Sequence, residues 1–192
     1  MAKEFFVKSN VVFGKNAAKA LPEILKEYEA NNVMVVYDAG VKMAGISEKV
    51  LAEIKKADVN VTIFDGVIPN PTNEVVEEAA SIALQNKIDV FVAVGGGSSI
   101  DLTKAVNILM TNPGPIGQYG GIGLVKKGVL PLIAVPTTAG TSSEVTNVVA
   151  LTDIKAVCKL SLIHILLWMS LQTEPFHRTR RSASPLKYCA NT

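Results

Sequence analysis

Three glycines and a serine, Gly95–Ser98, stand at a point where a chain could bind an anion. They follow the apolar run Asp89–Val94 and precede a helical pattern, so backbone N–H groups of a first helical turn and the helix dipole would face a ligand. Glycine lets the backbone approach phosphate oxygens closely, and Ser98 can cap the helix or donate its hydroxyl. The segment predicts a pyrophosphate site. The alternative is a tight turn that binds nothing.

Two charged residues follow this turn on the predicted helix. Asp101 and Lys104 lie three and six residues after Ser98, which places them near one face of the helix and close to its beginning. One interpretation is that they support the anion site. The other is that they form an ordinary ion pair at the surface.

A second polar segment, Pro136–Thr146, follows the apolar run that ends at Val135. It carries six Ser or Thr side chains around Gly140. Each hydroxyl both donates and accepts a hydrogen bond, so the segment could surround the polar groups of a ligand. The alternative is a turn in which the hydroxyls satisfy the local backbone.

A carboxylate also ends the first strongly apolar run, Val33–Tyr37. At that position Asp38 could accept a hydrogen bond from a ribose 2′-hydroxyl and would repel a 2′-phosphate. The residue therefore favours NAD over NADP as a cofactor, with NADP still possible. Asp38 could equally cap the helix that follows.

The elements that would position these groups alternate along the chain. Short apolar runs typical of buried strands are separated by stretches with helical spacing of apolar residues, the pattern of βαβ units. The strands are expected at 33–37, 59–64, 89–94 and 130–135, and the helices at 41–57, from Pro71 onward, and after Gly97. The alternation predicts an α/β fold with a doubly wound parallel sheet.

The flanking segments are less regular. We expect a β-hairpin over Phe5–Phe13 and a helix over Ala17–Tyr28, with Pro22 in its first turn. Residues 111–123 contain five glycines and two prolines, which predicts an excursion over the surface rather than a part of the core.

Taken together, two motifs resemble the paired signature of iron-containing (group III) alcohol dehydrogenases. They are Gly-Gly-Gly-Ser-x-x-Asp-x-x-Lys, from Gly95, and Pro-Thr-Thr-Ala-Gly-Thr-x-Ser-Glu-Val-Thr, from Pro136. The likeness extends over residues 5 to about 164. It implies a Rossmann-like first domain, hydride transfer between NAD(P) and a small primary alcohol or aldehyde, and a homo-oligomeric protein.

The resemblance also implies roles for particular residues. Some of them would hold the pyrophosphate, others would line the nicotinamide side or complete the cleft, and one would support the site. These residues are Gly96, Gly97 and Ser98 at the pyrophosphate, Thr137, Thr138 and Thr141 on the nicotinamide side, Asn70 and Lys159 in the cleft, and Asp101 as the supporting residue.

The chain departs from the family in its second half. Family members continue into an all-helical domain whose Asp and three His hold iron or zinc, and those positions are absent here. The two histidines, His164 and His177, belong to no metal-binding pattern, so we predict neither catalytic nor metal-binding residues in this chain. We expect a nucleotide-binding domain over residues 1–164 and an aberrant tail over 165–192, disordered or read in a shifted frame.

Two other functions stay open at this point. The chain could be a nucleotide-binding fragment without redox turnover, or it could resemble glycerol dehydrogenase and dehydroquinate synthase, which share the fold; the Pro-Thr-Thr-Ala-Gly-Thr block argues against the latter pair.

Composition excludes other classes of protein. The net charge of +2 and 48% hydrophobic residues are typical of a globular protein and do not indicate a nucleic-acid partner. The sequence contains no run of about 18 apolar residues, which a membrane-spanning helix would need, so we expect a cytoplasmic protein. The two cysteines form no disulfide framework.

Overall fold

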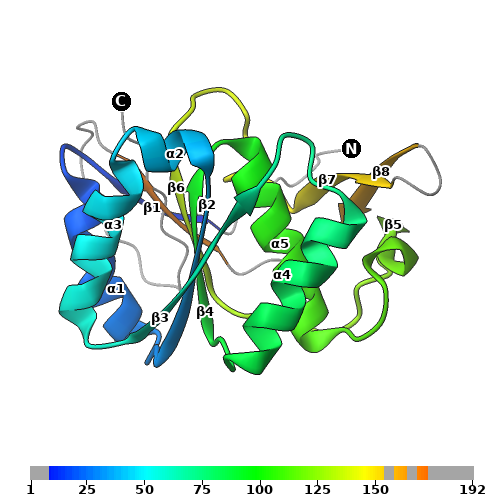
Figure 1. Ribbon diagram of the computed structural model, residues 1–192, viewed down its shortest axis with the longest axis horizontal. Coiled ribbons are helices and arrows are strands. Elements are labelled where there is room, and N and C mark those ends of the chain that lie inside the picture. The colour runs from blue at the N-terminus through cyan, green and yellow to red at the C-terminus, as the bar shows by residue number, and fades with distance from the viewer. Residues whose placement is uncertain (1–8, 154–157, 164–167, 173–192) are drawn as a thin grey trace, which may run out of the picture.

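A six-stranded sheet forms the centre of the computed structural model, which describes residues 9–153, 158–163 and 168–172 (Figure 1). The strand order is β1-β9-β6-β4-β2-β3 and every pairing is parallel. The strands are β1 (Ser9–Phe13), β2 (Asn32–Asp38), β3 (Asn60–Val67), β4 (Val90–Gly95), β6 (Leu132–Pro136) and β9 (Trp168–Gln172). The predicted α/β class with a parallel sheet is confirmed.

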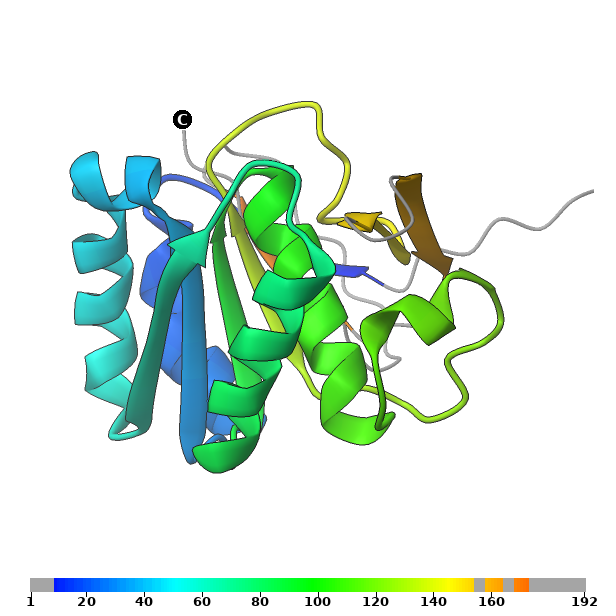
Figure 2. The same cartoon turned by 45° about the vertical axis from the view of Figure 1, so that its right-hand side comes forward.

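Helices cover both faces of this sheet, as Figure 2 shows. On one face lie α1 (Leu21–Glu27) and α3 (Ile46–Ile54), and on the other α4 (Asn73–Gln85) and α5 (Gly97–Thr111). Successive side chains of a strand point to opposite faces. Val33 and Val35 accordingly join one hydrophobic cluster and Met34 and Val36 the other. This explains why the central strands are apolar throughout.

The helix α5 is covered on all sides. Besides the central sheet and α4, it contacts a second sheet of three strands in the order β5-β8-β7. These strands are β5 (Gly121–Ile122), β8 (Cys158–Ile163) and β7 (Val148–Asp153). Every residue from Ser99 to Leu109 is buried, so the polar residues of α5 must find partners inside the protein.

Two predicted helices are divided in the structure. The segment 41–57 contains α2 (Ala39–Met43), α3 and the 3₁₀ turn η2 (Lys55–Ala57), because Gly45 adopts φ +67 and ends the first helix. The segment 17–28 begins as the 3₁₀ turn η1 (Ala17–Ala20) and continues as α1, with Pro22 in the first turn as predicted.

The prediction of a surface excursion over residues 111–123 is wrong in part. The 3₁₀ turn η3 (Ile116–Tyr119) buries Ile116 and Tyr119 in the core beside α4 and α5. Residues three apart share one face of a 3₁₀ turn, so these two apolar side chains point the same way. The Tyr119 hydroxyl donates to the Pro113 carbonyl oxygen at 2.8 Å.

The first and the last described strands are neighbours in the sheet. The predicted hairpin falls partly outside the described residues, and its described part, β1, is a single strand paired in parallel with β9. β9 lies between β1 and β6, although sequence analysis expected no regular element after residue 164. Its pairing comes from neighbouring strands and not from its own residue pattern. The rest of the predicted tail, with His177, lies outside the described residues, as does His164 just before it, and the boundary at 164 stays a prediction.

Within the described residues, none of the helices has the length and apolar character needed to cross a membrane.

Candidate functional site

A cleft opens at the carboxyl ends of β2, β4 and β6. It has a volume of about 390 Å³, within the range of about 300–1,000 Å³ found for ligand pockets. The chain continues from β2 to β3 on one side of the sheet and from β4 to β6 on the other, so the order of the connections switches between β2 and β4. Such a switch point is the usual place for a ligand in an open α/β fold. Six of the predicted cofactor residues line it together with three others: Asp38, Gly96, Gly97, Ser98, Thr137 and Thr138, with Gly40, Val41 and Ile46.

The glycine turn, defined as residues 95–98, joins β4 to α5. Gly95 has φ +145, and a Cβ there would collide with the Ser99 side chain, so only glycine fits. A Cβ on Gly96 would come within 2.8 Å of Thr138 Oγ1. The N-cap of α5 is Gly96, which has no side chain to cap the first turn, so the N–H groups at the start of the helix can face an anion in the cleft.

Asp38 is the N-cap of α2. Its Oδ1 accepts a hydrogen bond from the Val41 N–H at 2.9 Å, and its Oδ2 accepts one from the Ser99 hydroxyl at 3.4 Å. The capping interpretation of Asp38 is therefore confirmed. Because the residue also lines the cleft, and a carboxylate accepts up to about four hydrogen bonds, the ribose interpretation is compatible with this role.

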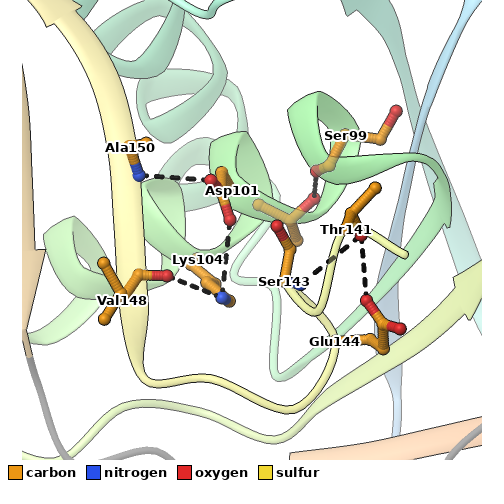
Figure 3. Close-up of polar contacts among 9 residues, drawn as sticks. Ser99, Asp101, Lys104, Thr141, Ser143, Glu144, Val148 and Ala150 are labelled. Carbon is orange, nitrogen blue, oxygen red and sulfur yellow. Dashed lines mark hydrogen bonds and ion pairs between the residues drawn. The ribbon is translucent and has the colours of Figure 1, made fainter. Parts of the chain in front are cut away.

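The hydroxyl loop, defined as residues 137–147, forms the facing wall. Its first residue is tied to the glycine turn, since the Thr137 N–H donates to the Gly95 carbonyl at 3.0 Å. Further along, the Thr141 hydroxyl donates to Glu144 Oε2 at 3.0 Å, and the Ser143 N–H donates to Thr141 Oγ1 at 3.4 Å (Figure 3). Thr137 and Thr138 face the cleft, whereas Thr141 lies beside it against Gly97.

The interpretation of Asp101 and Lys104 as a surface ion pair is wrong. Lys104 is fully buried; its ammonium donates to the Val148 carbonyl at 2.8 Å and lies 3.4 Å from Asp101 Oδ1 (Figure 3). Asp101 Oδ2 accepts from the Ala150 N–H at 3.1 Å. Burial lowers the pKa of Lys104 to about 8, against the opposing effect of the Asp101 and Glu144 carboxylates. The pair thus joins α5 to β7 instead of lining the cleft.

Asn70 and Lys159 are brought near one another by β7. Asn70 precedes Pro71, whose carbonyl accepts from the Thr152 N–H at 2.9 Å, and Lys159 is paired with Thr152 along β8. Asn70 is not among the described residues that line the cleft. The Lys159 side chain lies outside the described part of the structure.

Sequence reasoning missed the residues that α2 and α3 contribute to the cleft and the buried carboxylate of Glu144. Gly40, Val41 and Ile46 could have been found from their position just after Asp38 at a strand end. Glu144 is 5% exposed, and nothing in its local sequence marks it as buried.

No group of three or more His, Cys, Asp or Glu side chains that could hold a metal ion occurs among the residues that the structure describes. The residues present there do not fit the metal that the resemblance implies for the intact enzymes.

Comparison with known proteins gives consistent matches. The sequence profile of iron-containing alcohol dehydrogenases matches residues 8–169. NAD-dependent methanol dehydrogenase of Bacillus methanolicus is 36% identical over 159 residues, 83% of this chain and 42% of the relative. 1,3-Propanediol dehydrogenase of Citrobacter freundii is 33% identical over the same shares of each chain.

Solved structures agree with these matches. That of a 1,3-propanediol oxidoreductase superposes with a TM-score of 0.81 at 33% identity, over 85% of this chain and 43% of the other. An alcohol dehydrogenase from Oenococcus oeni superposes with a TM-score of 0.83 at 28% identity, over 98% and 46%. The chain spans less than half the length of the relatives it matches.

Proposed function

This chain belongs to the iron-containing alcohol dehydrogenase family, and we propose that it is the nucleotide-binding part of an enzyme that transfers hydride between NAD and a small alcohol or aldehyde. The observation that carries the proposal is the cleft at the carboxyl ends of β2, β4 and β6, which gathers six of the predicted cofactor residues. In our proposal residues 1–164 form the NAD-binding domain, and β9 is added to its sheet from the segment beyond.

Each wall of the cleft would bind a different part of NAD. The amides at the start of α5, at Gly97 and Ser98, would hold the pyrophosphate. The Asp38 carboxylate would accept from a ribose hydroxyl and disfavour NADP. Thr137 and Thr138 would contact the nicotinamide side, and Asn70 and Lys159 would extend the site toward β7 and β8.

The chemistry of hydride transfer comes from the bound nicotinamide, and the protein binds and orients it. The relatives are named for small substrates such as methanol and 1,3-propanediol, which support a small alcohol or aldehyde as the substrate. No step is assigned to a metal, because no described residues form a site for one. A homo-oligomeric state and a cytoplasmic location are further parts of the proposal.

Calorimetric titration of the 192-residue chain with NAD tests the cofactor site. Wild-type protein should bind NAD, and Gly97→Val should weaken binding at least about tenfold, because its side chain enters the wall beside the pyrophosphate position. Gly128→Val is the matched control, since a Cβ at Gly128 meets nothing within 4 Å. Wild-type protein that binds no NAD, or Gly97→Val protein that binds it equally well, would contradict the proposal.

NADH formation on addition of small primary alcohols separates turnover from binding alone. Alcohol-dependent NADH fluorescence from a protein that contains this chain supports the dehydrogenase. NAD binding without NADH under every alcohol supports a nucleotide-binding fragment.

A further inference from the structure

Ser99 is a fully buried serine in the first turn of α5, directly after the cleft residue Ser98. Ser98 is one of the residues that line the cleft, and Ser99 is not. Figure 3 shows the Ser99 side chain turned away from Asp101 and Lys104. A buried hydroxyl needs an acceptor for its proton inside the protein. The acceptor is Asp38 Oδ2, which lies 3.4 Å from the Ser99 hydroxyl oxygen at the end of β2.

The Asp38 carboxylate is therefore held from two sides. Its Oδ1 accepts from the Val41 N–H at 2.9 Å, the bond that caps α2, and its Oδ2 accepts from Ser99. Two glycines leave room for the carboxylate in this position, since a Cβ on Gly40 would lie 3.0 Å from Oδ1 and one on Gly95 would lie 3.4 Å from Oδ2. The last torsion of an aspartate side chain is soft, so a second hydrogen bond on the other oxygen is what fixes the plane of the carboxylate.

The same carboxylate also lines the cleft. A carboxylate accepts up to about four hydrogen bonds, and Val41 and Ser99 supply two, so about two acceptor positions remain for the hydroxyls of a ribose. A 2′-phosphate in the same place would meet the negative charge of Asp38. How well Asp38 distinguishes the two groups depends on where its oxygens are held.

We propose that Ser99 is a positioning residue for the choice between NAD and NADP: its hydroxyl holds Asp38 Oδ2 so that the carboxylate is oriented to bind the ribose hydroxyls of NAD and to repel the 2′-phosphate of NADP. The inference rests on the proposed binding of NAD. Ser99 touches no part of the cofactor and acts through Asp38. The two neighbouring serines thus have different tasks, Ser98 at the phosphates and Ser99 at the carboxylate.

Calorimetric titration with NAD and with NADP measures this choice. Ser99→Ala removes the hydroxyl and introduces a smaller residue with a high helix propensity, so α5 should be retained. The hydrogen bond is longer than the usual range of about 2.5–3.0 Å between two oxygens, so its loss should have a small effect. We expect the ratio of NADP to NAD affinity to rise about threefold, because the carboxylate is then free to turn away from the ribose position.

Thr103→Val is the matched control. It removes another fully buried hydroxyl of α5, one that donates to the Ser99 carbonyl oxygen at 2.6 Å and has no contact with Asp38. The ratio of affinities should stay as in wild type. Thermal unfolding monitors the fold of each variant. If Ser99→Ala is unfolded, Ser99→Cys replaces it, and its weaker S–H donor should still raise the ratio about twofold.

Combination with Asp38→Asn separates positioning from a general effect on the structure. Without the carboxylate charge, Ser99→Ala should change the ratio no further, so the two substitutions should be non-additive. Additive effects, an unchanged ratio in Ser99→Ala, or an equal rise in Thr103→Val would overturn the role of Ser99 while the NAD site stands. Wild-type protein that binds neither cofactor would overturn the proposed function itself.

Discussion

The glycine turn and the hydroxyl loop bound the same cleft but are held by different means. The turn joins the fully buried strand β4 to α5, which is buried from Ser99 to Leu109, and its shape is fixed by backbone conformation and close packing. Residues 138–142 of the loop are exposed, and the loop depends on the contacts of Thr141, Ser143 and Glu144. The phosphate side of the cleft is therefore preorganised by the sheet, whereas the other side depends on side-chain contacts that substitution can remove.

Alanine at one glycine of each segment should give the largest contrast. Gly95→Ala combines a strained φ of +145 with a collision against Ser99, and we expect it to destabilise the protein by about 3 kcal/mol. Gly140 has φ +85, and a Cβ there would meet nothing within 4 Å, so Gly140→Ala should lower the free energy of unfolding by only about 1 kcal/mol. Urea denaturation measures both. Equal costs would show that the turn is no more constrained than the loop.

The pH dependence of stability should report the loss of the proton from the buried Lys104 ammonium. Folded Lys104 releases its proton near pH 8, whereas the unfolded chain keeps it up to about its ordinary pKa of 10.5. Between these values the unfolded state binds more protons, so the free energy of unfolding should rise with pH, by at most about 1.4 kcal/mol per pH unit.

This rise is measured as the difference between wild type and Lys104→Met/Asp101→Asn, which cancels groups that titrate in both proteins. The difference in stability between the two proteins should grow above pH 8. A difference that is constant with pH would mean that Lys104 keeps its ordinary pKa.

Asp38→Asn should shift cofactor preference on the turn side of the cleft. Asparagine is also a good N-cap, so α2 is retained while the charge that disfavours a 2′-phosphate is lost. We expect the ratio of NADP to NAD affinity to rise about tenfold. Asp65→Asn, which removes an exposed carboxylate paired with Lys42 at 2.6 Å, is the control. An unchanged ratio would limit Asp38 to its capping role.

Thr141→Val should give the smallest effect. It keeps the shape of the side chain but removes the hydroxyl that joins the loop to Glu144. We expect about threefold weaker binding of NAD and unchanged binding of ADP-ribose, which lacks the nicotinamide, both measured by calorimetry. A loss shared by both ligands would place Thr141 at the phosphates instead.

The sequence predicted the segments whose determinants are local. The strands β2, β3, β4 and β6 carry their own apolar runs, and α4 and α5 begin where Thr72 and the glycines indicate. The six cleft residues lie at or just after those strand ends, and the family resemblance singled out all of them except Asp38. What sequence reasoning missed depends on distant partners: β9 is a strand because β1 and β6 flank it, and Lys104 and Glu144, ordinarily surface residue types, are buried by the loop and second sheet that cover α5.

The place of β9 between β1 and β6 bears on the order in which the chain can fold. Of the described strands, β1 is synthesised first, yet its partner β9 is synthesised only after almost all of the other described residues. Contacts between such distant segments form slowly, because a long loop must close before they stabilise anything. During synthesis β2, β3, β4 and β6 can assemble as a unit with their helices, whereas β1 can join the sheet only after β9 has paired with β6.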